Sequence, residues 1–148
     1  MNIYAVWWDD TVTVYNKYED AQTHLITWYK TVLTGCFYKS VGENVKVNNI
    51  ELDTDSILCR IPKKDNYIKP YLWIALPNDE KSAFFTLKQG DIIVEGEIDD
   101  DIDEYTSGKR STDFIAKYKA LQGCFVIDRV GDNTGVGRGS EHYRVSGL

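Results

Sequence analysis

The chain has 148 residues, a length that predicts one domain spanning residues 1–148, with a core that needs no disulfide or metal. Hydrophobic residues make up 43% and charged residues 27%, and no apolar run reaches membrane-spanning length, so we expect a globular protein with no membrane partner. The formal net charge of −6 disfavours a sequence-reading DNA-binding protein, because affinity for phosphate requires Lys and Arg on the contacting face.

Cysteine usage and the first residues indicate a cytoplasmic site of synthesis. The three cysteines, Cys36, Cys59 and Cys124, are odd in number and far apart, which predicts reduced, buried thiols and no disulfide framework. The opening sequence MNIYAVWWDD has neither the basic segment nor the long apolar segment of a signal peptide.

Strand-forming segments dominate the chain. They share β-branched or aromatic residues, alternation of apolar and polar side chains, and turn residues at their ends. In chain order they are residues 2–8, 11–15, 26–40, 46–52, 56–61, 84–87, 91–98, 124–130 and 142–145. Residues 26–40 could form one strand or two strands broken at Gly35. A helix over residues 20–33 is the alternative, although its apolar spacing is poor.

Turn chemistry separates these segments. Residues 17–25 are predicted to form a hairpin tip, and residues 63–80, with Pro70 and Pro77, are predicted to be mostly loop. The tripeptide Lys-Gln-Gly between residues 84–87 and 91–98 predicts a short hairpin with Gly90 at positive φ.

One helix is predicted, over about residues 112–122. Ser111 or Thr112 can cap its N-terminus, and Gly123 suits the position just past its end. Apolar residues recur at helical spacing within it, namely Phe114, Ile115, Tyr118 and Leu121. The expected fold class is therefore mainly β, a small β-barrel or sandwich of about seven short strands with one inserted α-helix.

An acidic run follows the predicted hairpin and consists of Asp99, Asp100, Asp101, Asp103 and Glu104. Its spacing fails the register of a calcium loop, because positions six and twelve would be Glu104 and Arg110, where glycine and a carboxylate are needed. We therefore expect no metal site here, and a solvated acidic loop is the default interpretation.

No other motif predicts catalysis. The loop that contains Gly135, Gly137, Arg138 and Gly139 lacks the helix and the Lys-Ser/Thr pair of a phosphate-binding loop, so we interpret it as a flexible interface loop. Neither His24 nor His142 has a cysteine at metal-ligand spacing. We expect no catalytic residue, no cofactor and no enzymatic activity.

Tryptophan is abundant, at positions 7, 8, 28 and 73. A stacking platform for single-stranded nucleic acid would need Arg and Lys between the aromatic rings, whereas Asp9 and Asp10 adjoin Trp8. Trp7, Trp8 and Trp73 are better candidates for core packing or for a protein interface.

Several stretches together resemble phage proteins of the head–tail connection, the neck, in tailed phages and prophages. They are TVTVYNKYED, ITWYKTVLTGCFYK, DSILCRIPK, FFTLKQGDIIVEGEI and the ending EHYRVSG. The closest grouping is with head-closure (stopper) proteins and minor capsid proteins. Such proteins are small β-barrels that assemble as an oligomeric ring beneath the portal, close or line the DNA channel and present a surface to the tail.

The resemblance implies partners and a location. We expect self-association into a ring on assembly, a portal or adaptor ring above, a tail-terminator or tail ring below, and genomic double-stranded DNA passing without sequence-specific binding. The chain would be made in the bacterial host cytoplasm and reside in the neck of the virion. A tail terminator or tail-completion ring is one alternative, and a small OB-like module that binds nucleic acid or a protein partner is another.

On this interpretation the acidic run lines the channel or docks on a neighbouring ring, because carboxylates cannot neutralise DNA phosphates. We also expect the isolated chain to be largely monomeric, and residues 99–109 and 131–140 to become ordered on assembly. Finally, we expect the carboxylates of the run to contribute nothing to the stability of the fold.

Overall fold

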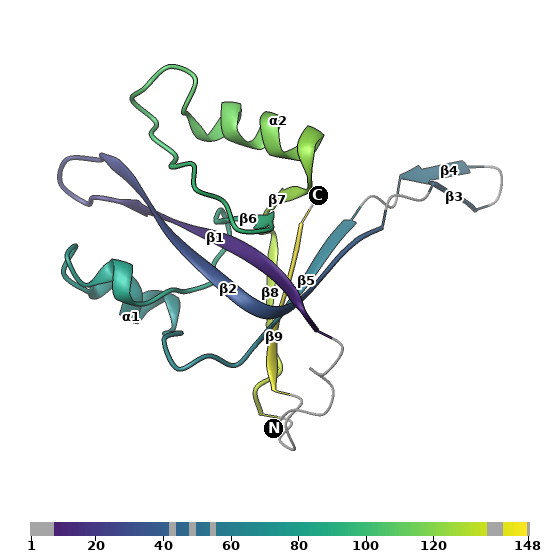
Figure 1. The fold of residues 1–148 in the computed structure, drawn as a ribbon, viewed down its shortest axis with the longest axis horizontal. Coiled ribbons are helices and arrows are strands. Elements are labelled where there is room, and N and C mark those ends of the chain that lie inside the picture. The colour runs from purple at the N-terminus through teal and green to yellow at the C-terminus, as the bar shows by residue number, and fades with distance from the viewer. Residues whose placement is uncertain (1–7, 42–43, 48–49, 54–55, 136–140, 148) are drawn as a thin grey trace.

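The computed structural model describes residues 8–41, 44–47, 50–53, 56–135 and 141–147, and it is mainly β (Figure 1). The strands are β1 (Asp10–Glu19), β2 (Ile26–Val41), β3 (Asn44–Val47), β4 (Ile50–Asp53), β5 (Ser56–Pro62), β6 (Ile92–Glu95), β7 (Cys124–Val126), β8 (Arg129–Asp132) and β9 (His142–Gly147). The helices are α1 (Pro70–Ala75), the 3-10 turn η2 (Lys81–Ala83) and α2 (Ser111–Leu121). The predicted fold class is thereby confirmed, including the one longer helix.

Seven of the strands form one antiparallel sheet in the order β7-β6-β1-β2-β5-β9-β8. Its two edge strands, β7 and β8, are consecutive in the chain and are separated only by residues 127 and 128. The chain therefore passes directly from one edge strand to the other. The two edges must lie close together, which requires the sheet to curl into a barrel. Gly147 marks the closure, since a Cβ on it would lie 2.0 Å from the backbone oxygen of Val126.

The barrel interior is the main hydrophobic core. It receives buried side chains from both halves of the sheet and from the loop before β6. They are Val12, Val14, Leu33, Cys36, Cys59, Ile61, Phe85, Leu87, Ile93, Phe125, Ile127, Tyr143 and Val145. All three cysteines are free and buried, as the sequence predicts, and burial raises the pKa of Cys124 to about 12.

Strand β2 links the two halves of the barrel. Its first part pairs with β1, and residues 37–41 pair with β5. Between them Gly35 has a positive φ of 70°, and the pairing with β1 shifts register between Asp10 and Val12. A bend at a glycine and a bulge allow one strand to pair with both halves of the curled sheet. Residues 26–40 therefore form one strand, and the helical alternative over residues 20–33 is wrong.

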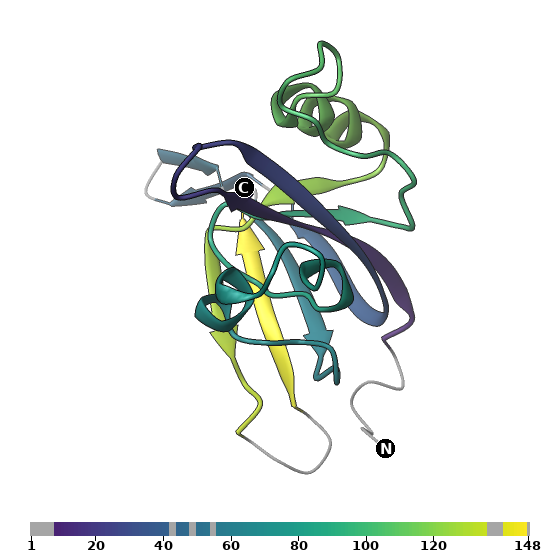
Figure 2. The same ribbon diagram turned by 90° about the vertical axis from the view of Figure 1, so that its left-hand side faces the viewer.

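A second core lies on the outer face of β1, β6 and β7, where α2 packs (Figure 2). It joins Tyr15, Ile92, Val94 and Cys124 from the strands, Phe114 and Tyr118 from α2, and Ile98 and Ile102 from the segment before the helix. That segment contains the acidic run, which is therefore packed against the barrel through its two isoleucines.

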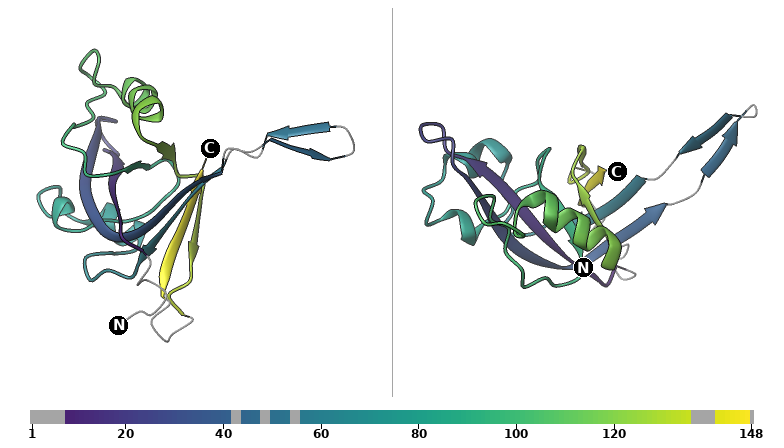
Figure 3. Two further views of the ribbon diagram at one scale, coloured as in Figure 1. Left: turned by 45° about the vertical axis from the view of Figure 1, so that its right-hand side comes forward. Right: turned by 90° about the horizontal axis from the view of Figure 1, so that it is seen from above.

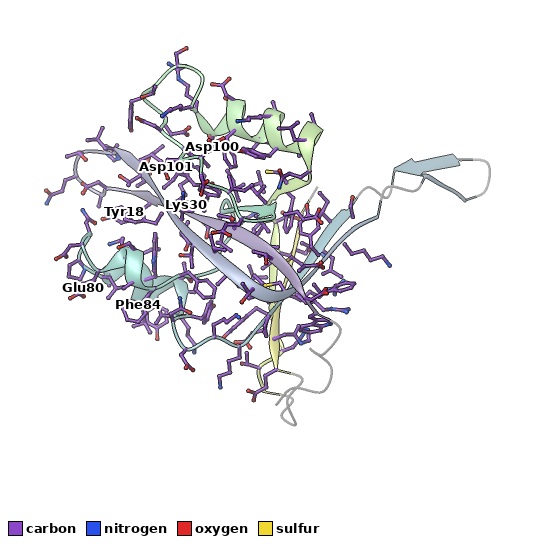
Figure 4. The ribbon with its side chains drawn as sticks, in the orientation of Figure 1. Tyr18, Lys30, Glu80, Phe84, Asp100 and Asp101 are labelled. Carbon is purple, nitrogen blue, oxygen red and sulfur yellow. The ribbon has the colours of Figure 1, made fainter. Side chains whose placement is uncertain are left out.

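A third layer lies beside the outer part of the β1–β2 hairpin. Helix α1 buries only Trp73, whose ring meets Tyr29 edge-on at 5.5 Å. Lys81 of η2 is almost fully buried; its ammonium donates to the oxygen of Leu76 and lies 4.2 Å from the ring centre of Tyr18. Figure 4 shows the hairpin between this layer and the acidic segment.

The β3–β4 hairpin is a separate two-stranded sheet that joins the ends of β2 and β5 (Figure 3). We call it the arm. Figures 1 and 3 show the arm standing away from the barrel. The sequence predicted one weak strand over residues 46–52, whereas the structure forms a strand on each side of Asn48 and Asn49.

Two further expectations are corrected. Residues 84–87 are no hairpin partner of residues 91–98: β6 pairs with β1 and β7, while Asn16 holds Thr86 through side-chain bonds of 2.7 and 3.2 Å. Gly90 does have the predicted positive φ, of 95°. Residues 124–130 are divided between β7 and β8. Residues 63–80 are mostly loop as predicted, with α1 on their apolar stretch.

Candidate functional site

The acidic segment, residues 99–104, lies over α2 and the tip of the β1–β2 hairpin. Tyr15 in β1 donates its hydroxyl to the backbone oxygen of Asp100. The carboxylate of Asp100 accepts hydrogen bonds from Tyr118 and from Lys117 at 2.8 Å. These two bonds lower the pKa of Asp100 below its usual value, because both stabilise the ionised form.

Glu104 satisfies the start of α2. Its two carboxylate oxygens accept from the backbone N–H and from the hydroxyl of Ser111, the latter at 2.9 Å. Arg110 occupies the cap position and makes no side-chain cap bond, so the predicted capping by Ser111 or Thr112 is wrong. The carboxylate of Glu104, seven residues before Ser111, accepts a backbone N–H at the start of the helix, as a cap side chain usually does.

Asp103 closes the loop between the segment and the helix. Its carboxylate accepts from the N–H of Tyr105 at 2.9 Å and from the hydroxyl of Thr106 at 2.7 Å, and these bonds lower its pKa. Its backbone N–H donates to the oxygen of Lys109. Loop residues 103–109 therefore have ordered contacts within the single chain.

The carboxylates of Asp99 and Asp101 point outward. The Asp101 side chain is 80% exposed and lies 3.4 Å from the ammonium of Lys30, which also donates to the backbone oxygen of Asp99 (Figure 4). The acidic run thus divides into groups that hold the fold, at 100, 103 and 104, and groups that face solvent, at 99 and 101.

A recess opens between the segment and α2, with a volume of about 200 Å³. Its lining is mixed in charge and comprises Asp100, Asp101, Asp113, Lys109, Lys117, Gly108 and Phe114. Lys117 pairs with Asp100, and Lys30 approaches Asp101 to 3.4 Å but leaves its side chain 80% exposed. Asp101 and the exposed Asp113 are therefore the lining carboxylates most open to an incoming cation.

A second hollow of about 450 Å³ lies between α1 and the β8–β9 hairpin. It is lined by Tyr67, Ile68, Tyr71, Leu72 and Tyr143, with Lys69, Asp132 and Thr134 at its polar side. Tyr71 is 67% exposed and Leu72 45% exposed. Sequence reasoning missed this surface, although Pro70 before an apolar run is a signal for a short helix.

The other predicted site residues are dispersed. Trp8 is half-buried against Phe37 and His142, and Trp73 is fully buried, so it presents no ring to a partner. Gly135 is exposed and lies in the loop after β8. Trp7, Gly137, Arg138 and Gly139 lie outside the described residues.

Within the described ranges, no group of three or more His, Cys, Asp or Glu side chains could hold a metal ion. Nor does any described helix have the length and apolarity needed to cross a membrane.

A family model described as Family of unknown function (DUF6751) matches residues 7–148. The chain belongs to this family. No curated protein and no solved structure matches it. The match spans the barrel, the arm, α1 and α2 of this chain.

Proposed function

We propose that this chain is a structural protein of the phage neck, working as one subunit of a ring of head-closure type. The proposal rests on the resemblance of its strand segments to neck proteins, and on one feature of the structure, the arm. In this role the ring would join the DNA-filled head to the tail and close or line the DNA channel, between a portal or adaptor ring and a tail ring.

The arm supports the proposal because its described strands form a sheet of their own, outside the barrel. Strands β3 and β4 pair only with each other, whereas every strand of the barrel belongs to the seven-stranded sheet. An isolated two-stranded hairpin is marginally stable in water, so a hairpin that stands away from its own core gains most from a neighbouring protein. A ring supplies such a neighbour to every copy.

The acidic segment supplies a second surface. Asp99 and Asp101 leave their carboxylates toward solvent, while the remaining carboxylates hold the segment in place. In a ring this charge would be repeated around the axis, either facing passing DNA or facing a basic surface on a neighbouring subunit.

The experiment is a deletion of the gene in the phage or prophage that carries it, followed by electron microscopy of lysates. We expect full heads without tails, separate free tails, and loss of infectivity. Normal particles would overturn the proposal. Tails of abnormal length attached to no heads would instead identify a tail terminator.

A complementing variant tests the arm itself. Replacing residues 42–55 with an Asn-Gly turn joins Val41 to Ser56, which are already cross-strand partners. This variant should be incorporated poorly and should leave heads unjoined, whereas the wild-type chain restores infectious particles. Full complementation by the armless chain would show that the arm has no part in assembly.

A further inference from the structure

The outer face of β2, β5, β9 and β8 is basic, in a chain whose net charge is −6. Cross-strand register places its side chains in two neighbouring rows. One row runs from Phe37 through Arg60 and Arg144 to Gly131; the other runs from Lys39 through Leu58 and Ser146 to Arg129. With strands about 4.8 Å apart, the four cations lie within a patch roughly 15 Å wide. We call this patch the basic face.

Its charge is little compensated. Arg60 and Arg144 are direct cross-strand partners, an arrangement that is unfavourable for like charges. Among the described outward-facing residues of these strands there is no Asp or Glu, and of the four cations Arg129 lies 4.0 Å from the carboxylate of Asp128, just before β8. Arg60 also lies 5.7 Å from the ring centre of Phe37. Such a face is stabilised by a negatively charged partner.

The same chain carries a complementary surface elsewhere. The interior core lies between the two halves of the barrel, so the basic face and the α2-covered face point in different directions (Figures 1 and 2). On the α2 side, Asp101 and Asp113 line the recess of about 200 Å³ that has room for a side chain.

We propose that two copies of this chain associate head to tail, with the basic face of one copy against the acidic segment and recess of the next. Arg144, exposed at the centre of the basic face, enters the recess and meets Asp101 and Asp113. The inference deepens the proposed function, on which it rests for its setting, by naming the surfaces through which subunits meet.

The charges also select the symmetry of the contact. Neither surface can pair with itself, because each would face its own sign of charge. A two-fold dimer through either surface is therefore disfavoured, and the contact is heterologous. Repeated heterologous contacts produce a closed ring or an open filament.

Nucleic acid is the competing partner for a basic face, and the charge balance of the chain favours a protein. A chain of net charge −6 is repelled from a polyanion at long range, and four cations release few counterions. The acidic segment and the recess beside it, in contrast, are present on every copy at equal concentration.

The test uses purified chain in sedimentation experiments across protein concentration, at low salt and at about 0.5 M salt. Wild-type chain, expected to be largely monomeric when dilute, should associate weakly as concentration rises, and high salt should weaken the association further. Arg144→Glu alone, or Asp101→Lys alone, should weaken it roughly tenfold or more, because each places like charges in contact. An equimolar mixture of the two variants should restore association, since each retains the surface that the other has lost.

Matched controls change the same charge elsewhere. Lys69→Glu and Asp79→Lys alter exposed residues outside both surfaces and should leave association unchanged. The inference is overturned if the wild-type chain stays monomeric up to roughly millimolar concentration at low salt, if the mixture fails to restore association, or if Arg144→Glu abolishes binding of a duplex oligonucleotide while self-association persists. If the two variants restore each other's association but the protein proves absent from phage necks, this inference stands and the proposed function is wrong.

Discussion

The carboxylates of the acidic segment differ in what they contribute to the fold. Asp100 and Glu104 bind the acidic segment to α2 through Tyr118, Lys117 and Ser111. The sequence suggested that none of these carboxylates serves the fold, because five acidic side chains close together look like a solvated loop. The signal that was overlooked is Ile98 and Ile102, two apolar residues four apart that the segment buries.

Replacing Glu104 with Ala should lower the free energy of unfolding by about 1 kcal/mol, the usual effect of losing a helix cap. The substitution leaves the first N–H of α2 and the hydroxyl of Ser111 without their acceptor. Asp99→Ala is the matched control and should have little effect, since its side chain is exposed. Urea unfolding measures both, and equal stabilities for the two variants would show that the cap contributes nothing.

At the scale of elements, the sequence predicted the strands with strong alternation and placed the helix close to its observed bounds, Ser111–Leu121, although its N-cap was wrong. It failed where tertiary contacts decide. The Lys-Gln-Gly turn is typical of a hairpin, yet Asp91 directs the chain differently by accepting from the backbone of Lys17 and the side chain of Asn16. Residues 124–130 contain no turn signal, because the chain passes from one sheet edge to the other while staying extended.

Acid should release the acidic segment from α2. Hydrogen bonds lower the pKa of Asp100 and of Asp103 in the folded chain, so below about pH 4 the unfolded chain binds more protons than the folded one. The stability that these groups contribute is present above that pH and is lost as the pH falls through their folded pKa values. Asp91 has the opposite effect on the pH dependence of stability, because burial raises its pKa.

Hydrogen exchange between pH 6 and pH 3 measures this loss. The protection factor of the Tyr105 amide, which donates to Asp103, should fall with pH before those of amides in β1 do. Simultaneous loss of protection in both places would mean that the segment and the barrel unfold as one unit.

The arm should be dispensable for folding. Replacing residues 42–55 with an Asn-Gly turn should change the free energy of unfolding by less than about 0.5 kcal/mol, because β3 and β4 add no strand to the barrel sheet. Thermal and urea unfolding of the armless and full-length chains provide the comparison. A clear loss of stability would show that the arm supports the barrel.

For the whole molecule, closure of the barrel depends on a small residue at one point. Gly147 needs no positive φ, yet a Cβ there would also lie 2.8 Å from the ring of Phe125. Composition and periodicity predict a mainly β barrel or sandwich, but they do not reveal which strands meet, because β5 and β9 are far apart in sequence. Composition and periodicity likewise do not reveal the opposite charges of the two outer faces, because Arg60 and Arg144 become neighbours only through the strand register.

Gly147→Ala should therefore destabilise the chain by roughly 1–3 kcal/mol, the range of overpacking substitutions. Gly131→Ala is the matched control: it also lies in a strand without positive φ, and a Cβ there would be at least 3.8 Å from its nearest neighbour. Urea unfolding should separate the two variants. Similar stabilities would indicate that β7 and β9 move apart at little cost.

The strand order of the barrel also has a consequence during translation. The β1–β2 hairpin can form as soon as residue 41 has left the ribosome, whereas β5 has no partner on its far side until residues 142–147 emerge. During that interval the nascent chain exposes an unpaired strand edge beside apolar residues that will later lie inside the barrel. The time between synthesis of β5 and synthesis of β9 is therefore the period in which this protein is most open to aggregation and to capture by chaperones.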